Sequence, residues 1–449
     1  MKTTLRNASV VKLALFLGCA SIAEAQFSTA WLTQFGTGSS DEGLAIAVDS
    51  TGQSWITGFT DGNLGGIGNA GGEDFFLSRV SPTGVVTSTA QRGSSFQDLS
   101  FGIALLGTST VFIGGNTQGS PDGQTNLGSY DNAILRYTTG GIWQSTLLTG
   151  STSYEYTNGL AANSTNLFSA GDSGGSYAGQ TGPGAVITKS DATGTPIWTR
   201  FVSTGGGDNG FSVALDATGN SYLAGQTSGS VPGASNAGGY DIFFAKYDPS
   251  GNQTLIKQRG TSDFDVARAI KVDLSGNIYL AGQTYGNLDG QSNAGGIGDG
   301  FLTKLDSNGN LLWTRLFGGS ARDMVWALDF DSSGNLWIGG DSNSNLGTHT
   351  NAGGHDAFVA EYDSNGNLLG THFLATAADE IIFGLAAAPG GGVVVTGYTD
   401  GNLGGTNAGA GDIFVAKIVP EPTTAVSLLL GLGVLAARRN RRSLRRIQP

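Results

Sequence analysis

The sequence predicts an all-β protein folded as a seven-bladed β-propeller, and three observations support that prediction. Seven similar apolar segments each end in a glycine, and these glycines stand 54 to 58 residues apart, at Gly58, Gly115, Gly171, Gly225, Gly282, Gly340 and Gly397. Each of the first six units contains four segments with the alternation of a β-strand, and nothing between residues 30 and 418 keeps a helical period. Repetition of a four-stranded antiparallel unit is the pattern of propeller blades.

The unit at residues 211–260 shows how the strands are predicted. FSVALD is followed by the turn ATGN and the second strand SYLAGQT, and then by a loop of about a dozen residues rich in Gly, Ser and Asn. DIFFAKYD, the turn PSGN and QTLIKQRG complete the unit. Gly, Asn and Asp favour such turns because they tolerate positive φ or bond to the local backbone. The long loop makes this blade larger than common ones.

The two ends of the repeat array predict how the propeller closes. The seventh unit stops after its third strand, DIFVAKI at 412–418, so it lacks a fourth strand of its own. The segment STAWLTQFG at 28–36 matches fourth-strand segments such as LLWTRLFGG at 311–319. We therefore expect the strand Trp31–Phe35 to complete the last blade and remove the exposed edges. A stacked solenoid is the alternative, but it needs capping units that we do not find.

Units of the form D-x-x-G-N-x-Y-[LIV]-x-G-x-T followed by D-[AI]-F-[VF]-A-K-[YL] resemble the bacterial propeller repeats called SBBP repeats. The resemblance covers most of residues 31–418 and is best in units four to six. It implies a propeller fold, often at the cell surface, and no particular activity. Unit three has Gly184 where the others have the strand-entry Asp, so that Asp is not needed in every blade.

Residues 1–25 have the pattern of a secretory signal peptide. Basic residues flank or interrupt an apolar run, and Ala23 and Ala25 form a small-x-small cleavage site, so the mature propeller would span residues 26–418. Cys19, the only cysteine, lies in this signal, and the surrounding FLGC fits a lipoprotein box poorly. The mature chain is therefore expected to contain no thiol and no disulfide.

The charge of the propeller region excludes one class of partner. Residues 26–418 contain 14 basic and 33 acidic residues. A surface with that imbalance repels nucleic acid and anionic membranes, so we expect no nucleic-acid partner.

The tail, residues 419–449, has three parts in a fixed order. Pro420, Glu421 and Pro422 precede fifteen uncharged residues at 423–437, and an arginine cluster follows at Arg438, Arg439, Arg441 and Arg442. As a helix the uncharged run would be about 22 Å long, short of a hydrocarbon core of roughly 30 Å. The arginines would act as a stop signal that stays cytoplasmic and leaves the propeller outside. The tail is therefore predicted to be a weak transmembrane segment.

The order of these parts closely resembles the PEP-CTERM sorting signal of Gram-negative bacteria; an ordinary C-terminal anchor is the alternative. The resemblance implies that exosortase, a membrane transpeptidase-like enzyme, recognises Pro-Glu-Pro and removes the tail. It also implies transient anchoring in the inner membrane, then a place at the cell surface or in the extracellular matrix. Proteins with this signal are typically associated with exopolysaccharide and biofilm matrix.

A recurring carboxylate at the start of the third strand is the first candidate site. It occurs in six of the seven units, at Asp74, Asp131, Asp241, Asp299, Asp356 and Asp412. These residues could form a ring of cation ligands, or each could cap its loop by accepting backbone N–H bonds. Recurrence in nearly every blade favours the structural role, because a binding site usually breaks the symmetry of a repeat.

The remaining motifs are weak candidates for chemistry. The Asp-x-x-Gly-Asn turns, such as the one starting at Asp216, have a single carboxylate and hairpin length, unlike a calcium loop. His349 and His355 share one long loop and could approach each other, but with Asp356 they make a poor metal site. No helix follows the glycine-rich loops, so they are not phosphate-binding loops. We therefore predict no catalytic residue, no cofactor and no metal ligand.

Three functions are compatible with this pattern. The first is a non-enzymatic surface or matrix scaffold associated with exopolysaccharide. The second is a lectin-like propeller whose long loops or strand tryptophans bind sugar. The third, a polysaccharide-degrading enzyme, is the least favoured, because catalysis would concentrate ionisable groups on one face. The histidine loop is the nearest feature to such an irregularity.

Overall fold

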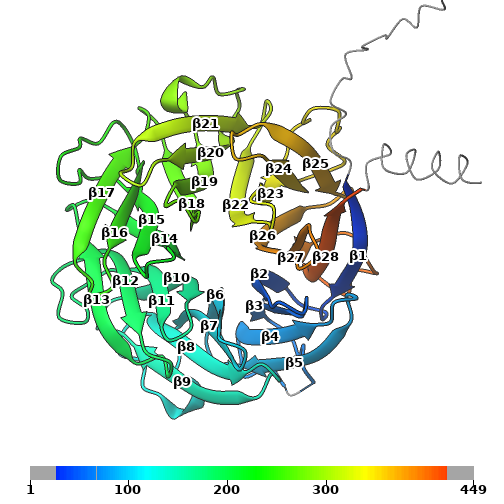
Figure 1. The fold of residues 1–449 in the computed structure, drawn as a ribbon. Coiled ribbons are helices and arrows are strands. Elements are labelled where there is room, and N and C mark those ends of the chain that lie inside the picture. The colour runs from blue at the N-terminus through cyan, green and yellow to red at the C-terminus, as the bar shows by residue number, and fades with distance from the viewer. Residues whose placement is uncertain (1–26, 67, 422–449) are drawn as a thin grey trace, which may run out of the picture.

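The computed structural model describes residues 27–66 and 68–421, which form seven four-stranded antiparallel sheets around a central channel (Figure 1). The prediction of an all-β, seven-bladed propeller is confirmed. The expected signal peptide with Ala23 and Ala25, the segment 423–437, Pro422 and the four arginines of the stop signal lie outside the described residues.

The strands occupy equivalent places in each blade. The inner strands, next to the channel, are β2 (Asp41–Val48), β6 (Asp98–Leu106), β10 (Glu155–Ala162), β14 (Asp208–Leu215), β18 (Asp265–Val272), β22 (Asp323–Phe330) and β26 (Glu380–Ala387). The second strands are β3 (Ser54–Thr60), β7 (Thr110–Thr117), β11 (Leu167–Ser173), β15 (Ser221–Thr227), β19 (Ile278–Thr284), β23 (Leu336–Ser342) and β27 (Val393–Thr399).

The third strands are β4 (Asp74–Val80), β8 (Asp131–Thr138), β12 (Gly184–Ser190), β16 (Asp241–Tyr247), β20 (Asp299–Leu305), β24 (Asp356–Tyr362) and β28 (Asp412–Pro420). The outer strands are β5 (Val86–Arg92), β9 (Trp143–Thr149), β13 (Pro196–Val202), β17 (Gln253–Arg259), β21 (Leu311–Phe317), β25 (Leu368–Leu374) and β1 (Phe27–Phe35). Two short 3-10 turns, η1 (Pro121–Gly123) and η2 (Leu288–Gly290), lie in the loops of the second and fifth blades.

The N-terminal strand closes the ring, as the phase of the repeats predicted. The last sheet has the order β1-β28-β27-β26, and Figure 1 shows β1, in blue, beside β28, in red-orange. The pairing runs from Phe27 opposite Pro420 to Phe35 opposite Ile413. Both strands are longer than expected, because Phe27 and Ser28 pair with the two residues that follow 418.

The hydrophobic core lies between the faces of neighbouring blades. Between the fourth and fifth blades, for example, Tyr222 and Phe244 pack with Ile270 and Phe301, all of them buried. The same arrangement joins the last blade to the first. Blades therefore stabilise one another mainly through apolar burial, which fits a chain with no cysteine after Cys19.

Each inner strand contains one β-bulge, and the bulge explains the glycines that mark the repeat. One extra residue per inner strand has no partner in the second strand: Leu44, Phe101, Asn158, Phe211, Arg268, Trp326 and Phe383. Opposite each bulge the second strand carries the repeat glycine. A Cβ atom there would lie only 1.7–1.9 Å from a backbone carbonyl oxygen of the inner strand, so a side chain does not fit.

Candidate functional site

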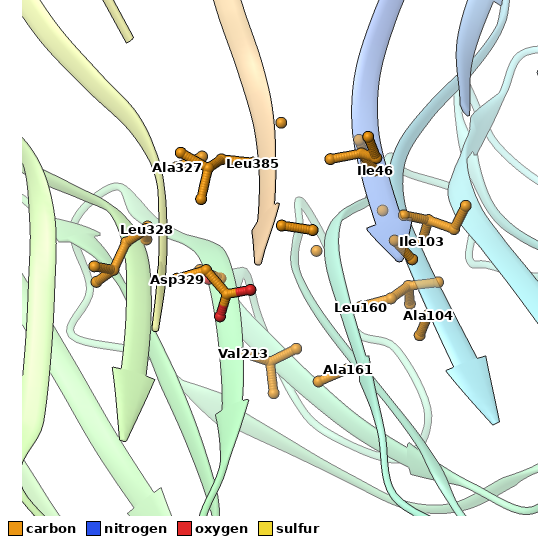
Figure 2. A pocket seen from close by; sticks show the side chains of 18 of the residues that line it. Ile46, Ile103, Ala104, Leu160, Ala161, Val213, Ala327, Leu328, Asp329 and Leu385 are labelled. Carbon is orange, nitrogen blue, oxygen red and sulfur yellow. The ribbon is translucent and has the colours of Figure 1, made fainter. Parts of the chain in front are cut away.

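The inner strands of all seven blades line the central channel, which has a volume of about 520 Å³. Figure 2 shows aliphatic side chains around it, including Ile46, Leu160, Val213 and Leu385. Three charged residues are part of the lining: Arg268, Lys271 and Asp329. All seven blades converge on this concavity, and it holds only three charged side chains, so the channel is the candidate functional site.

The seven bulge residues form one end of this lining, close to the start of the inner strands. The second strands end and the third strands begin on the same face: Asp265 of β18 pairs with Thr284 of β19, which pairs with Asp299 of β20. This end, the mouth of the channel, therefore opens on the face of the long loops. One Leu, one Asn, one Arg, one Trp and three Phe occupy it, so the side chains of the mouth do not follow the repeat.

Arg268 is the cation at the mouth, and aromatic rings flank it. Its guanidinium carbon lies 4.1 Å from the ring centroid of Phe211 and 5.0 Å from that of Trp326. Its Nε is buried and has no hydrogen-bond partner among the described residues. Burial, with a smaller effect of Arg322, lowers the pKa of Arg268 to about 10, so the side chain is still charged at neutral pH.

A hydrogen-bond network fixes Trp326. The indole Nε1 donates to Oδ1 of Asp341 at 2.7 Å. The other oxygen of Asp341 lies 2.7 Å from Nη1 of Arg322 and 2.7 Å from Nδ1 of His355. The bond to Asp341 raises the pKa of His355. Asp341 is fully buried, and both of its oxygens are engaged, so its charge is compensated inside the network.

The six predicted third-strand aspartates lie where they cap the long loops. One oxygen of each accepts the backbone N–H of a residue four or five positions earlier at 2.7–2.9 Å; these donors are Ala70, Leu127, Ala237, Ala294, Ala352 and Ala408. All six aspartates are at most 1% exposed. Residues 27–66 and 68–421 contain no group of three His, Cys, Asp or Glu that could hold a metal ion.

A second ring of acidic residues lies at the start of the inner strands and was not predicted from the sequence. It consists of Asp41, Asp98, Glu155, Asp208, Asp265, Asp323 and Glu380, and each accepts the backbone N–H of the residue four positions earlier at 2.5–2.8 Å. That residue is Ser or Thr in every blade but one, which has Gly319. The pattern [ST]-x-x-x-[DE], which precedes six of the seven first strands, was the signal that could have revealed this ring.

The Asp-x-x-Gly-Asn motifs form tight turns. Asp216 accepts the backbone N–H groups of Thr218 at 2.9 Å and Asn220 at 3.0 Å. Burial opposes its ionisation, but hydrogen bonds from Asn220, Thr218 and Tyr222 outweigh that effect and lower the pKa of Asp216 to about 2. The carboxylate of Asp216 is thus occupied by hydrogen bonds within the turn.

The three histidines do not converge. Nε2 of His349 lies 2.6 Å from Oδ2 of Asp356, and its ring stacks on Phe373 at 3.8 Å. His355 contacts Asp341 instead, and Nε2 of His372 lies 2.8 Å from Oγ1 of Thr29. The loop therefore places His349 and His355 on different carboxylates.

Glu42, which is partly buried on β2, predicts a pH dependence of stability. Burial, with a smaller effect of Asp400, raises its pKa from 4.5 to about 7. Below pH 4.5 Glu42 is protonated in both the folded and the unfolded state, and the folded protein keeps its full stability. As the pH rises through 7 the folded protein must ionise a buried carboxyl group, and this stability is lost. We expect Glu42→Gln to raise the unfolding free energy by roughly 1 kcal/mol at pH 8 and to change it little at pH 4. Urea melts at both pH values check this; a gain of equal size at pH 4 would contradict it.

The propeller ends where the predicted sorting motif begins. Val419 and Pro420 are paired residues of β28, and Glu421 is the last described residue. No linker separates the motif from the closed blade. Within the described part of the chain, no helix is long and apolar enough to cross a membrane.

Comparison with known proteins identifies the tail and one distant relative. Residues 419–442 match the model of the PEP-CTERM protein-sorting motif. "Regulatory protein FlaEY" of Caulobacter vibrioides is 28% identical over 220 residues, which is 45% of this chain and 22% of that protein. The chain thus spans about a fifth of the length of this relative.

Solved structures with a similar shape are remote in sequence. A structure described as BBS1N in complex with ARL6DN aligns with a TM-score of 0.47 and 9% identity, covering 89% of this chain and 99% of that one. YCF48 bound to D1 peptide aligns with a TM-score of 0.43 and 11% identity, covering 89% and 98%. Neither similarity carries a functional argument. The chain is a seven-bladed β-propeller that ends in a PEP-CTERM sorting motif, which indicates export and sorting to the cell surface.

Proposed function

We propose that this protein is a non-enzymatic propeller of the cell surface or extracellular matrix, released from the inner membrane by an exosortase-type enzyme and held among exopolysaccharide. The observation that carries the proposal is the junction at Pro420, where the sorting motif follows a complete, closed propeller without a linker. The propeller is then the exported product, and the tail serves its delivery.

The contacts of the ionisable groups support a non-enzymatic role. The three histidines are engaged with Asp356, Asp341 and Thr29, and none forms a hydrogen bond to a serine hydroxyl among the described residues. The two rings of buried acids accept backbone N–H bonds in nearly every blade. A serine nucleophile is usually activated by an adjacent histidine base, and these contacts do not supply one.

A surface groove favours sugar binding as the second candidate. Thr261, Ser262, Asp263 and Asn287 line it together with Tyr285, which is 40% exposed. The ring of Tyr285 packs on Phe264 with centroids 5.3 Å apart, which orients its phenol. An oriented exposed aromatic next to polar groups provides both an apolar face and hydrogen bonds for a saccharide.

Fractionation of cells that produce the full chain tests the proposal. We expect the protein in surface or matrix fractions, with a C-terminus that ends near the Pro-Glu-Pro motif by mass spectrometry. A chain still ending in RRIQP in those fractions would contradict processing. The purified matrix polysaccharide is then added to the mature protein: weak, non-saturating association supports the scaffold, and saturable binding lost in Tyr285→Ala supports the lectin. Depolymerisation of the polysaccharide would overturn both.

A further inference from the structure

We propose that the mouth of the central channel binds an organic carboxylate with an apolar body, its carboxylate on Arg268 and its body against the partly buried apolar side chains of the mouth. This site lies outside the repeat motifs of the blades. It does not depend on the proposed surface function.

The charges of the channel leave one cation without a partner. Nζ of Lys271 lies 2.8 Å from Oδ1 of Asp329, and the other oxygen of Asp329 accepts the backbone N–H of Ala387 at 2.9 Å. Among the described residues, Arg268 forms no such ion pair and no hydrogen bond, although it lines the same channel. A partly buried guanidinium without an acceptor is costly, and an anion that supplies the acceptor removes that cost.

The surroundings of Arg268 favour a planar anion. The rings of Phe211 and Trp326 lie against the guanidinium, and Trp326 is held in place by Asp341. Aromatic rings satisfy the faces of a guanidinium and leave its N–H edge for hydrogen bonds, and a carboxylate matches that edge with two parallel bonds. Asp341 does not compete for Arg268, because Trp326, Arg322 and His355 already engage it.

The rest of the lining selects the body of the ligand. Leu44, Phe101 and Phe383 complete the mouth beside Arg268, and each of them is only partly buried. An aliphatic or aromatic body gains free energy by displacing water from these side chains. A sugar acid would instead bury hydroxyl groups against them, which costs free energy unless each finds a hydrogen bond. The mouth thus favours an amphipathic carboxylate over a uronic acid.

Calorimetric titration of the mature protein with octanoate tests the site. We expect saturable binding that is at least tenfold weaker for octanol, which lacks the charge, and for acetate, which lacks the body. Glucuronate distinguishes a sugar acid from an amphipathic carboxylate. If glucuronate binds as tightly as octanoate, the proposed apolar body of the ligand is wrong. Absence of octanoate binding would overturn the site itself.

Two variants locate the binding. Arg268→Met should reduce octanoate affinity at least tenfold, whereas Lys257→Met removes an exposed cation of the outer strand β17, away from the channel, and should leave the affinity within twofold. Unchanged binding to R268M, or equal losses in both variants, would overturn the assignment. If R268M does not fold, thermal shifts of the unmodified protein decide: octanoate must raise the melting temperature more than octanol does at the same concentration.

Discussion

Deletion of residues 26–36 should remove most of the stability of the propeller. The deletion strips β1 from β28 along the whole register from Phe27 to Phe35 and leaves β28 as an unpaired edge. It also removes Phe27, which is 8% exposed and packs edge-on against Trp337 with centroids 5.0 Å apart. Loss of one buried aromatic alone costs about 3–5 kcal/mol, which is comparable with the whole stability of many domains. Thermal melts and size-exclusion chromatography should show a large fall in melting temperature with aggregation.

The contacts of Gln34 show why this strand is an integral part of the last blade. Its Nε2 donates to the carbonyl of Gly401 at 2.9 Å, and its Oε1 accepts the N–H of Leu403 at 2.9 Å. In the fourth blade Gln258 makes the equivalent bonds, with Gly229 at 2.9 Å and Val231 at 2.8 Å. β1 therefore orders the long loop of its blade as a local fourth strand does.

A circular permutant provides the matched control for the deletion. Moving residues 26–36 behind Pro420 through a short turn keeps every residue of β1 but makes it a local strand of its blade. We expect the permutant to melt close to the unmodified protein. A deletion variant that melts like the intact protein would show that closure by β1 contributes little.

The parts of the fold that repeat in the sequence were predictable. The spacing of the glycines gives the number of blades, and the missing fourth strand after 418 gives the closure. The capping aspartates could be inferred from recurrence alone. Such features follow from local rules, turn chemistry and strand alternation, which act the same way in every blade.

The channel mouth was not predictable, for a physical reason. Phe211, Arg268 and Trp326 follow one another at intervals of about 57 residues, and in the sequence they look like ordinary strand residues. They meet only because each occupies the extra position of a bulge, and a bulge shifts the strand alternation by one residue without a mark of its own in the sequence. The sequence shows the repeat glycine opposite the bulge as a marker of the repeat length, but it does not show that the position excludes a side chain.

Gly282→Ala should therefore destabilise the protein by roughly 3 kcal/mol or more, although it adds a single methyl group. The new Cβ would lie 1.9 Å from the carbonyl oxygen of Val266 and 3.0 Å from the nitrogen of Arg268. Both contacts are with backbone, so no side chain can rotate away, and relief requires separating β18 from β19 at the bulge. Gly38→Ala is the matched control, because no atom lies within 4 Å of its added Cβ. Urea unfolding of the two variants measures the difference.

The same substitution also links the bulge to the channel mouth, since the strand shift that makes room for the added methyl group moves the backbone that carries Arg268. We expect the folded fraction of G282A to bind octanoate more weakly than the G38A control does, under conditions where both give native circular dichroism. If G282A unfolds at the same urea concentration as G38A, the bulge is soft enough to accept a side chain. The repeat glycines would then need another explanation than the close approach of two backbones.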